Sequence, residues 1–93
     1  MPNLLVRVKI MPREAEIKPP TILEELSKKH PEIQVRSSKE EPIAFGLVAL
    51  IADFMTDDEA GAMEKIEEAM RSLDSVGEFE VLGASRISAK VGK

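Results

Sequence analysis

The spacing of apolar residues changes several times along this chain, and the order of the changes leaves few folds open to it. Residues 3–11 alternate, with four apolar side chains on one face and Arg7 and Lys9 on the other. A period of two with β-branched residues predicts a strand, which Pro12 ends. A polar loop to residue 18 follows.

A helix is predicted next, because Pro19 and Pro20 suit a first helical turn. Thr21 and Glu24 also fit a capping box, so the start is uncertain by one turn. Pro31 stops the helix. Beyond it, residues 33–40 alternate weakly and are polar, which predicts an exposed edge strand. Residues 39–42 are then expected to form a turn.

Residues 43–55 are the most apolar stretch, and their number suits either a helix or a strand. Asp53 marks one alternating face as polar, which favours a central strand. The buried face is then predicted to carry Val48, Leu50, Ala52 and Phe54. The other face carries an apolar stripe that should be exposed unless something covers it, made of Leu47, Ala49 and Ile51.

A second helix is predicted to begin at residues 56–59, where Thr56 and Glu59 fit a capping box. The carboxylates of Asp57, Asp58 and Glu59 suit the positive end of a helix. Apolar residues at helical spacing follow, and the helix is expected to end near residues 72–75. Residues 76–87 return to alternation and predict a last strand.

The predicted order is therefore β-α-β-β-α-β in a single domain, residues 1–93, with a flexible tail at about 88–93. This is the α+β arrangement called ferredoxin-like, a four-stranded antiparallel sheet with two helices on one face. The other face would be open to a partner. Val6, Val8, Leu50, Phe54, Ile66, Met70 and Val81 are predicted to be buried.

The composition excludes several classes of function. Thirteen lysines and arginines stand against seventeen aspartates and glutamates, for a net charge of −4, and the aromatic residues are three phenylalanines. Platforms for nucleic acid need a basic field and stacked aromatics, so direct nucleic-acid binding is not expected. There is no cysteine, no membrane-spanning apolar run and no signal peptide, which predicts a cytoplasmic chain without a membrane partner.

No constellation of residues predicts chemistry. His30 lies at the end of the first predicted helix without a second ligand, so we expect a packing role for it. Residues 57–59 lack the alternating oxygen ligands of a calcium loop, and helix capping explains them. We therefore expect no metal, no cofactor and no enzymatic active site.

Three segments carry a resemblance to a known family. Residues 41–50 read EPIAFGLVAL, residues 6–12 read VRVKIMP, and residues 80–87 begin with Glu-Val and end with Arg-Ile. Together they resemble archaeal translation elongation factor 1-beta over nearly the whole chain. The first motif is long enough to be specific, whereas the other two alone would be weak.

The resemblance implies a guanine nucleotide exchange factor for the GTPase elongation factor 1-alpha. In eukaryotic relatives a lysine next to the last residue reaches towards the magnesium site, and the matching position here is Arg86, followed by Ile87. The family's aromatic-glycine pair, which faces the GTPase, is Phe45-Gly46. Leu47, Ala49 and Ile51 are a further contact face on this hypothesis. Six residues follow Ile87, whereas many relatives stop near that position.

A different class of function stays open. Small-molecule-binding regulatory modules share the same fold, so the fold alone does not decide between them and an exchange factor. Such modules usually pair through their sheets and are fused to an enzyme. A shift of the melting temperature with amino acids would favour this alternative.

Overall fold

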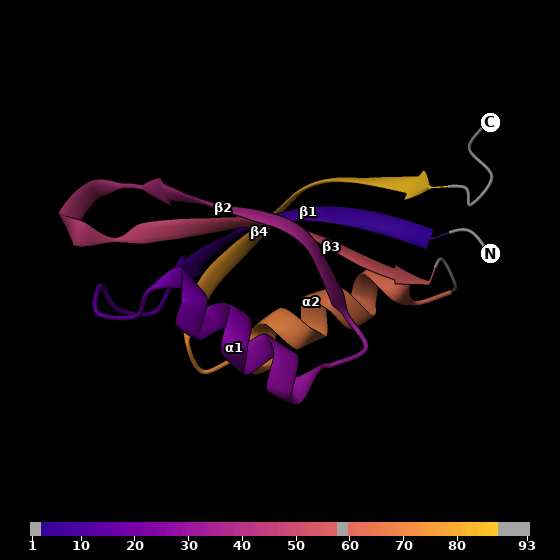
Figure 1. Ribbon diagram of the computed structural model, residues 1–93, viewed down its shortest axis with the longest axis horizontal. Helices are drawn as coiled ribbons and strands as arrows, with labels where there is room; N and C mark the ends of the chain where they lie inside the picture. Colours follow the sequence, from indigo (N-terminus) through magenta and orange to yellow (C-terminus); the bar gives the residue numbers. More distant parts are fainter. Residues whose placement is uncertain (1–2, 58–59, 88–93) are drawn as a thin grey trace.

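The computed structural model describes residues 3–57 and 60–87. Its elements follow in the order β1 (Asn3–Pro12), α1 (Pro19–Lys29), β2 (Gln34–Pro42), the short 3-10 turn η1 (Ala44–Gly46), β3 (Val48–Asp57), α2 (Ala62–Ser72) and β4 (Val76–Ile87). The four strands form one antiparallel sheet in the order β2-β3-β1-β4. Both helices lie on one side of it (Figure 1). The predicted ferredoxin-like fold is confirmed.

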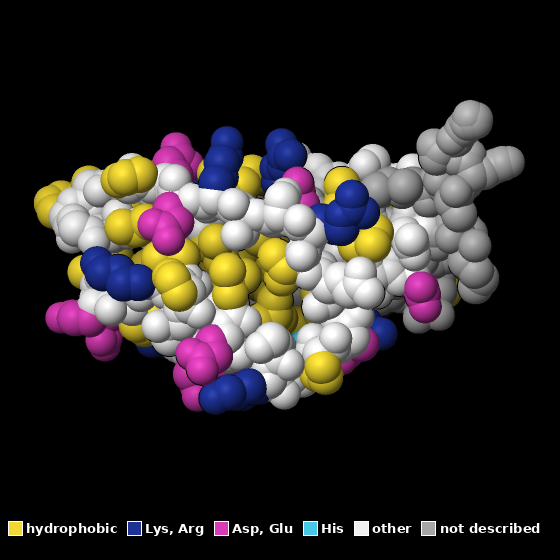
Figure 2. All heavy atoms as spheres, viewed as in Figure 1, with side chains coloured by type: hydrophobic (Ala, Val, Ile, Leu, Met, Phe, Trp, Pro, Cys, Tyr) yellow, Lys and Arg dark blue, Asp and Glu magenta, His cyan; other side chains and the backbone are white. Residues whose placement is uncertain are grey.

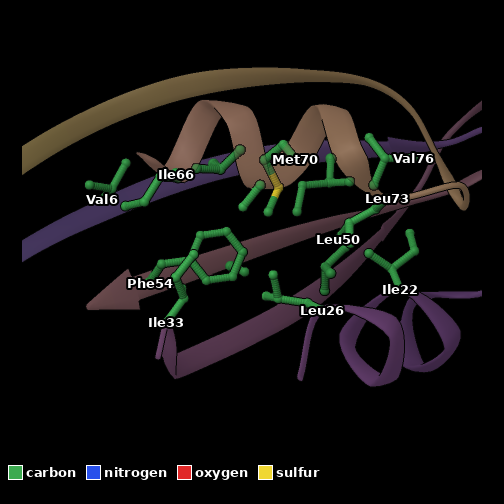
Figure 3. Close-up of a cluster of buried hydrophobic side chains, with 14 residues drawn as sticks. Val6, Ile22, Leu26, Ile33, Leu50, Phe54, Ile66, Met70, Leu73 and Val76 are labelled. Atoms are coloured by element: carbon green, nitrogen blue, oxygen red, sulfur yellow. The ribbon is translucent and has the colours of Figure 1, made fainter. Parts of the chain in front are cut away.

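The hydrophobic core lies between the sheet and the two helices. Strand β1 runs through the middle of the sheet, and its side chains Val6, Val8 and Ile10 are fully buried. They meet Phe54 and Leu50 from β3, and both helices close the layer with apolar side chains (Figure 3). Most of the predicted core is confirmed. Val81 is the exception: it is only half-buried, because β4 lies at the edge of the sheet.

The first helix begins at Pro19, as one of the two alternatives predicted. The second helix begins later than predicted. Strand β3 continues through Thr56 to Asp57, and α2 starts at Ala62. The N-cap residue of α2 is Gly61, which has a left-handed backbone and makes no side-chain capping hydrogen bond. Because Thr56 pairs with Leu4 in the sheet, the predicted Thr56–Glu59 capping box is wrong at Thr56. Glu59 and the tail 88–93 lie outside the described residues.

The connection between β2 and β3 also differs from the prediction. Strand β2 continues through the predicted turn to Pro42, and β3 starts at Val48 rather than at Ile43. The two strands form a long hairpin that projects beyond both helices (Figure 1). Apolarity at residues 43–47 therefore belongs to the tip of a hairpin.

Strand β4 changes register in its middle. Val8 pairs with Val81, but Arg7 pairs with Gly83, so Leu82 is an extra residue in β4. Such a β-bulge lets both halves of the strand keep their pairing with β1. In consequence Val81 and Arg86 both point to the helix-covered face.

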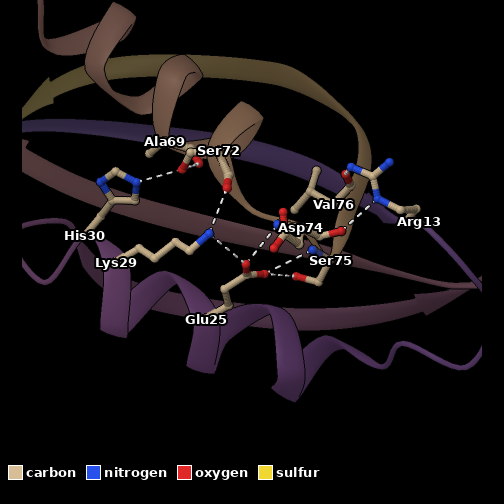
Figure 4. Close-up of polar contacts among 9 residues, drawn as sticks. All are labelled: Arg13, Glu25, Lys29, His30, Ala69, Ser72, Asp74, Ser75 and Val76. Carbon is tan, nitrogen blue, oxygen red and sulfur yellow. Dashed lines mark hydrogen bonds and ion pairs between the residues drawn. The ribbon is translucent and has the colours of Figure 1, made fainter.

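The turn between α2 and β4 is held by residues from distant parts of the chain (Figure 4). Glu25 on α1 accepts hydrogen bonds from the backbone N–H groups of Asp74 (2.8 Å) and Ser75 (3.0 Å) and from the Ser75 hydroxyl. Arg13 donates to the carbonyl oxygens of Asp74 (2.8 Å) and Val76 (3.2 Å). The start of β4 is thus tied to α1 and to the end of β1.

Candidate partner-binding site

The Phe45-Gly46 pair forms the tip of the β2–β3 hairpin. Phe45 has φ 61° and ψ 32°, and Gly46 has φ 77°. Two successive left-handed residues are the centre of a type I′ turn, which the hydrogen bond from Leu47 N–H to Ala44 O (3.2 Å) closes. The bond from Ile43 N–H to Leu47 O (2.8 Å) joins the turn to the hairpin.

Phe45 is an unusual residue at this position. The left-handed region costs a bulky L-residue about 1–2 kcal/mol, and the turn type prefers Asn or Gly. Its ring offers no packing in return, since Phe45 is 93% exposed. An exposed aromatic side chain on a strained backbone is a feature of functional sites. The sequence prediction placed Phe45 in a strand, whereas the structure presents it at the end of a turn.

Arg86 lies near the end of β4, with Ile87 as the next and last residue of the strand. The backbone of Arg86 pairs with Leu4, and that of Ile87 pairs with Asn3. Residues opposite each other in an antiparallel pair share a face, so Arg86 is on the side of Leu4, which packs against the core. Its side chain is nevertheless exposed at this end of the sheet.

The structure does not bring the two predicted contact regions together. Arg86 and Thr56 both pair with Leu4, so Arg86 lies at the end of the sheet where β3 finishes. The hairpin tip instead lies at the end where β3 begins, just before Val48. The eight steps from Val48 to Thr56 span about 26 Å at ~3.3 Å per residue. Figure 1 shows the tip and the end of β4 at opposite ends of the molecule. A partner that touches both must extend along the whole domain.

The predicted apolar contact face is only partly exposed. Leu47 and Ile51 are half-buried, but Ala49 has no exposed surface, so its predicted exposure is wrong. Lys9 lies opposite Ile51 and Glu41 lies opposite Ala49, on the strands to either side of β3. Their side chains meet over β3, with 3.8 Å between Lys9 Nζ and Glu41 Oε1. This ion pair lies on the same face of the sheet as Ala49.

A polar cluster at the centre of the open face was missed by the sequence prediction. Arg7 donates from Nε to Asp53 Oδ1 (2.8 Å), and Ser37 Oγ donates to Asp53 Oδ2 (3.0 Å). Asp53 is only 9% exposed, although no helix covers this face. The ferredoxin-like order makes β1 and β3 neighbours. Opposite charges on the polar faces of these two strands could therefore have predicted the Arg7–Asp53 ion pair.

Figure 2 shows the side bordered by β2 and α1, where charges of both signs are interspersed and apolar side chains gather in a hollow between the two elements. Residues 3–57 and 60–87 contain no group of three or more His, Asp or Glu that could hold a metal ion. Neither described helix is long and apolar enough to cross a membrane.

His30 is half-buried and shares a hydrogen bond with Ser72 Oγ (2.9 Å), which suits the predicted packing role.

Comparison with known families decides the class of this chain. The family described as the EF-1 guanine nucleotide exchange domain matches residues 5–87, from β1 to the end of β4. The chain belongs to this family. The resemblance seen in the sequence motifs is therefore confirmed, and Phe45 and Arg86 both lie inside the matched region of the exchange domain.

Similar proteins of archaea support the exchange-domain assignment. Elongation factor 1-beta of Aeropyrum pernix is 37% identical over 89 residues, which are 94% of this chain and 99% of that protein. The same-named protein of Sulfurisphaera tokodaii is 38% identical and covers 94% of this chain and 98% of its own length. The same-named protein of Methanospirillum hungatei is 31% identical over 94% of this chain and 100% of its own length. The similarity thus extends over nearly the whole length of each relative.

A solved structure supports the fold alone. The C-terminal domain of the MgtC protein from Mycobacterium tuberculosis superposes with a TM-score of 0.55 over 99% of this chain and 95% of that one. The identity is 18%, so this likeness says nothing about the function of the exchange domain.

Proposed function

We propose that this chain promotes the exchange of GDP for GTP on elongation factor 1-alpha during translation elongation, acting by binding alone. Membership of the exchange-domain family and the elongation factor 1-beta relatives support the partner. The observation that carries the proposal is the Phe45 ring, held out at the hairpin tip at a cost in backbone strain. A strained, exposed aromatic has a purpose if it enters an apolar pocket of a partner.

Exchange sets a thermodynamic condition on that binding. The factor must bind the nucleotide-free GTPase more tightly than the GDP-bound form, because a ligand with equal affinity for two states shifts neither. GDP is held largely through its phosphates and the bridging Mg²⁺. An exchange factor therefore gains most by disturbing the magnesium and phosphate contacts.

Arg86 supports a mechanism for this disturbance. Its positively charged guanidinium stands at the exposed end of β4. A cation brought beside the partner's magnesium site competes electrostatically with Mg²⁺ for the same oxygen atoms. On this proposal Phe45 anchors one end of the domain, and Arg86 with Ile87 acts at the other, beyond the length of β3. Gly46 permits the turn, and Leu47 and Ile51 border the contact.

Stopped-flow release of a fluorescent GDP from elongation factor 1-alpha, with Mg²⁺ varied, tests the proposal. Arg86→Ala should slow factor-dependent release by about tenfold or more, since a lost charged contact is worth about 1.5–3 kcal/mol. Excess Mg²⁺ should inhibit the unmodified factor. Lys28→Ala is the matched control, because it removes one positive charge from the exposed surface of α1 instead of from β4.

The outcomes separate the parts of the proposal. If the unmodified chain does not accelerate GDP release, the exchange function is wrong. If Arg86→Ala and Lys28→Ala both behave like the unmodified chain at every Mg²⁺ concentration, only the cation mechanism is wrong. A higher melting temperature with amino acids, without any exchange activity, would instead favour a small-molecule-binding module.

A further inference from the structure

The loop between β1 and α1, residues 13–18, lies directly beside the tip of the β2–β3 hairpin. A Cβ atom at Gly46 would lie 4.0 Å from the Cβ atom of Ala15, which is an ordinary van der Waals distance. Apart from the chain neighbours of Gly46, no other atom of the described residues would be within 4 Å of it. Figure 1 shows the loop and the tip at the same end of the molecule. The loop is therefore the part of the domain that meets this side of the tip.

The tip has little other support. It belongs to the part of the hairpin that projects beyond both helices (Figure 1). Phe45 and Gly46 are both exposed, so their own packing does not hold them. The hydrogen bond from Leu47 N–H to Ala44 O fixes the shape of the turn, but not its position relative to the rest of the domain. A segment with so few buried contacts moves easily unless a neighbour restrains it.

The loop itself is fastened to the domain at both ends. At its start, Arg13 N–H donates to Ser75 O (2.9 Å), and the Arg13 side chain donates to two further carbonyl oxygens of the turn between α2 and β4. At its end, the loop runs into Pro19, the first residue of α1, which is buried. A loop held in this way can restrain a segment that touches it.

The middle of the loop is also ordered, and it turns Ala15 inwards. Ile17 N–H donates to Glu14 O (3.0 Å), which closes a turn with Ala15 and Glu16 at its centre. The Ile17 side chain packs against the core. Ala15 is half-buried, whereas Glu14 and Glu16 on either side of it are exposed. Ala15 is thus the residue of this turn that faces the hairpin tip.

We propose that Ala15 is a positioning residue for nucleotide exchange, because the fastened loop restrains the hairpin tip and so holds the Phe45 ring ready for elongation factor 1-alpha. This inference rests on the proposed function. An anchor that is ordered before binding loses less conformational freedom when it binds, so the affinity rises without any new contact to the partner. Ala15 acts on exchange through Phe45 alone.

Two variants at one position test the restraint in the chain without its partner. Ala15→Gly removes the Cβ atom that faces Gly46, and Ala15→Ser, the matched control, keeps it. Backbone order parameters of Phe45 and Gly46 are measured by NMR relaxation, with a thermal melt of each variant. We expect Ala15→Gly to lower these order parameters by about 0.1 or more, where about 0.85 is typical of a rigid backbone. Ala15→Ser should leave them unchanged.

Exchange measurements test whether the restraint serves binding. The rate of GDP release, titrated with each variant, gives a half-saturating concentration of factor and a limiting rate. Ala15→Gly should raise the half-saturating concentration about threefold or more and leave the limiting rate unchanged, because the anchor must then be ordered on binding. In a chain that already carries Phe45→Ala, Ala15→Gly should have no further effect, since there is no ring to position. A purely structural role would instead give losses that add.

Each outcome decides the question. Unchanged order parameters in Ala15→Gly overturn the inference, and so do equal losses of affinity in Ala15→Gly and Ala15→Ser. Losses that add to that of Phe45→Ala overturn it as well. In these three cases normal exchange by the unmodified chain leaves the proposed function intact. Absence of any exchange by the unmodified chain rejects the proposed function and this inference with it, even where the order parameters fall as expected.

Discussion

Arg7 and Asp53 lie opposite each other on β1 and β3 and are joined by two parallel hydrogen bonds, Nε to Oδ1 at 2.8 Å and Nη2 to Oδ2 at 3.1 Å. Such a two-point contact holds both side chains in one geometry. The hydrogen bond from Arg7 holds the pKa of Asp53 below its ordinary value against the opposing effect of burial, and Ser37 contributes in the same direction. The centre of the open face is thus ordered before any partner binds.

Asp53→Ala should lower the free energy of unfolding by about 1–3 kcal/mol, because it removes a hydrogen-bonded carboxylate that is nearly buried. Since the folded-state pKa of Asp53 is below the unfolded value, its stabilisation is present at neutral pH. That stabilisation is lost as the pH falls below about 4. Urea denaturation at pH 7 and pH 3 measures both effects. An unchanged denaturation midpoint at pH 7 would contradict the prediction.

The Phe45 position should show opposite effects on stability and on function. Phe45→Asn should raise the free energy of unfolding by about 1 kcal/mol, because Asn tolerates the left-handed backbone that Phe resists. Phe45→Ala keeps the strain and should not be stabilised. Both variants should weaken binding to elongation factor 1-alpha by a similar factor, as titration of the complex would measure. Full binding by Phe45→Asn would show that the aromatic ring is not the anchor.

Glu25 should make part of the stability sensitive to acid. Burial raises its pKa, but hydrogen bonds from Ser75, Asp74 and Lys29 outweigh burial and lower the pKa to about 2. The stabilisation is therefore complete above the unfolded value, near 4.5, and is lost as the pH falls towards 2. The melting temperature of the unmodified chain should fall across this range more steeply than that of Glu25→Gln. Glu24→Gln, a change at an exposed neighbour, should leave the slope unaltered.

Two glycines of β4 should respond differently to alanine. A Cβ atom at Gly77 would lie 3.0 Å from Arg13 Cα and 3.1 Å from the carbonyl oxygen of Pro12, and backbone atoms cannot move aside cheaply. Gly77→Ala should therefore cost about 1–3 kcal/mol. At Gly83 a Cβ atom would meet nothing within 4 Å, so Gly83→Ala should change the stability little. Urea midpoints of the two variants, measured side by side, test the contrast.

The sequence was sufficient for the fold where a pattern and a chemical boundary coincided. Alternation that stops at Pro12 predicted β1, and two prolines predicted the start of α1. Residues 43–47 were assigned to a strand because apolar composition does not distinguish a strand from an apolar hairpin tip. The left-handed backbone of Phe45 has no signature of its own, since the usual sign of this turn is Asn-Gly.

The start of α2 and the features of the open face needed tertiary information. Thr56 has the chemistry of a helix cap, but pairing with Leu4 keeps it in β3. Ala49 lies on the same face as Lys9 and Glu41, which come from two different strands and meet only in the folded sheet. The bulge at Leu82 likewise depends on the register of β4 against β1.

The position of β1 in the middle of the sheet has a consequence for how the chain is made. β1 pairs with β4 through Val8 and Val81, more than seventy positions apart, whereas β2 and β3 meet through a short turn. The hairpin can form within about 1–10 μs of its completion. At about 5–20 residues per second, synthesis needs several more seconds to deliver β4. During that interval one edge of β1 lacks its partner, so nascent chains should be most prone to aggregate just before the last strand is released.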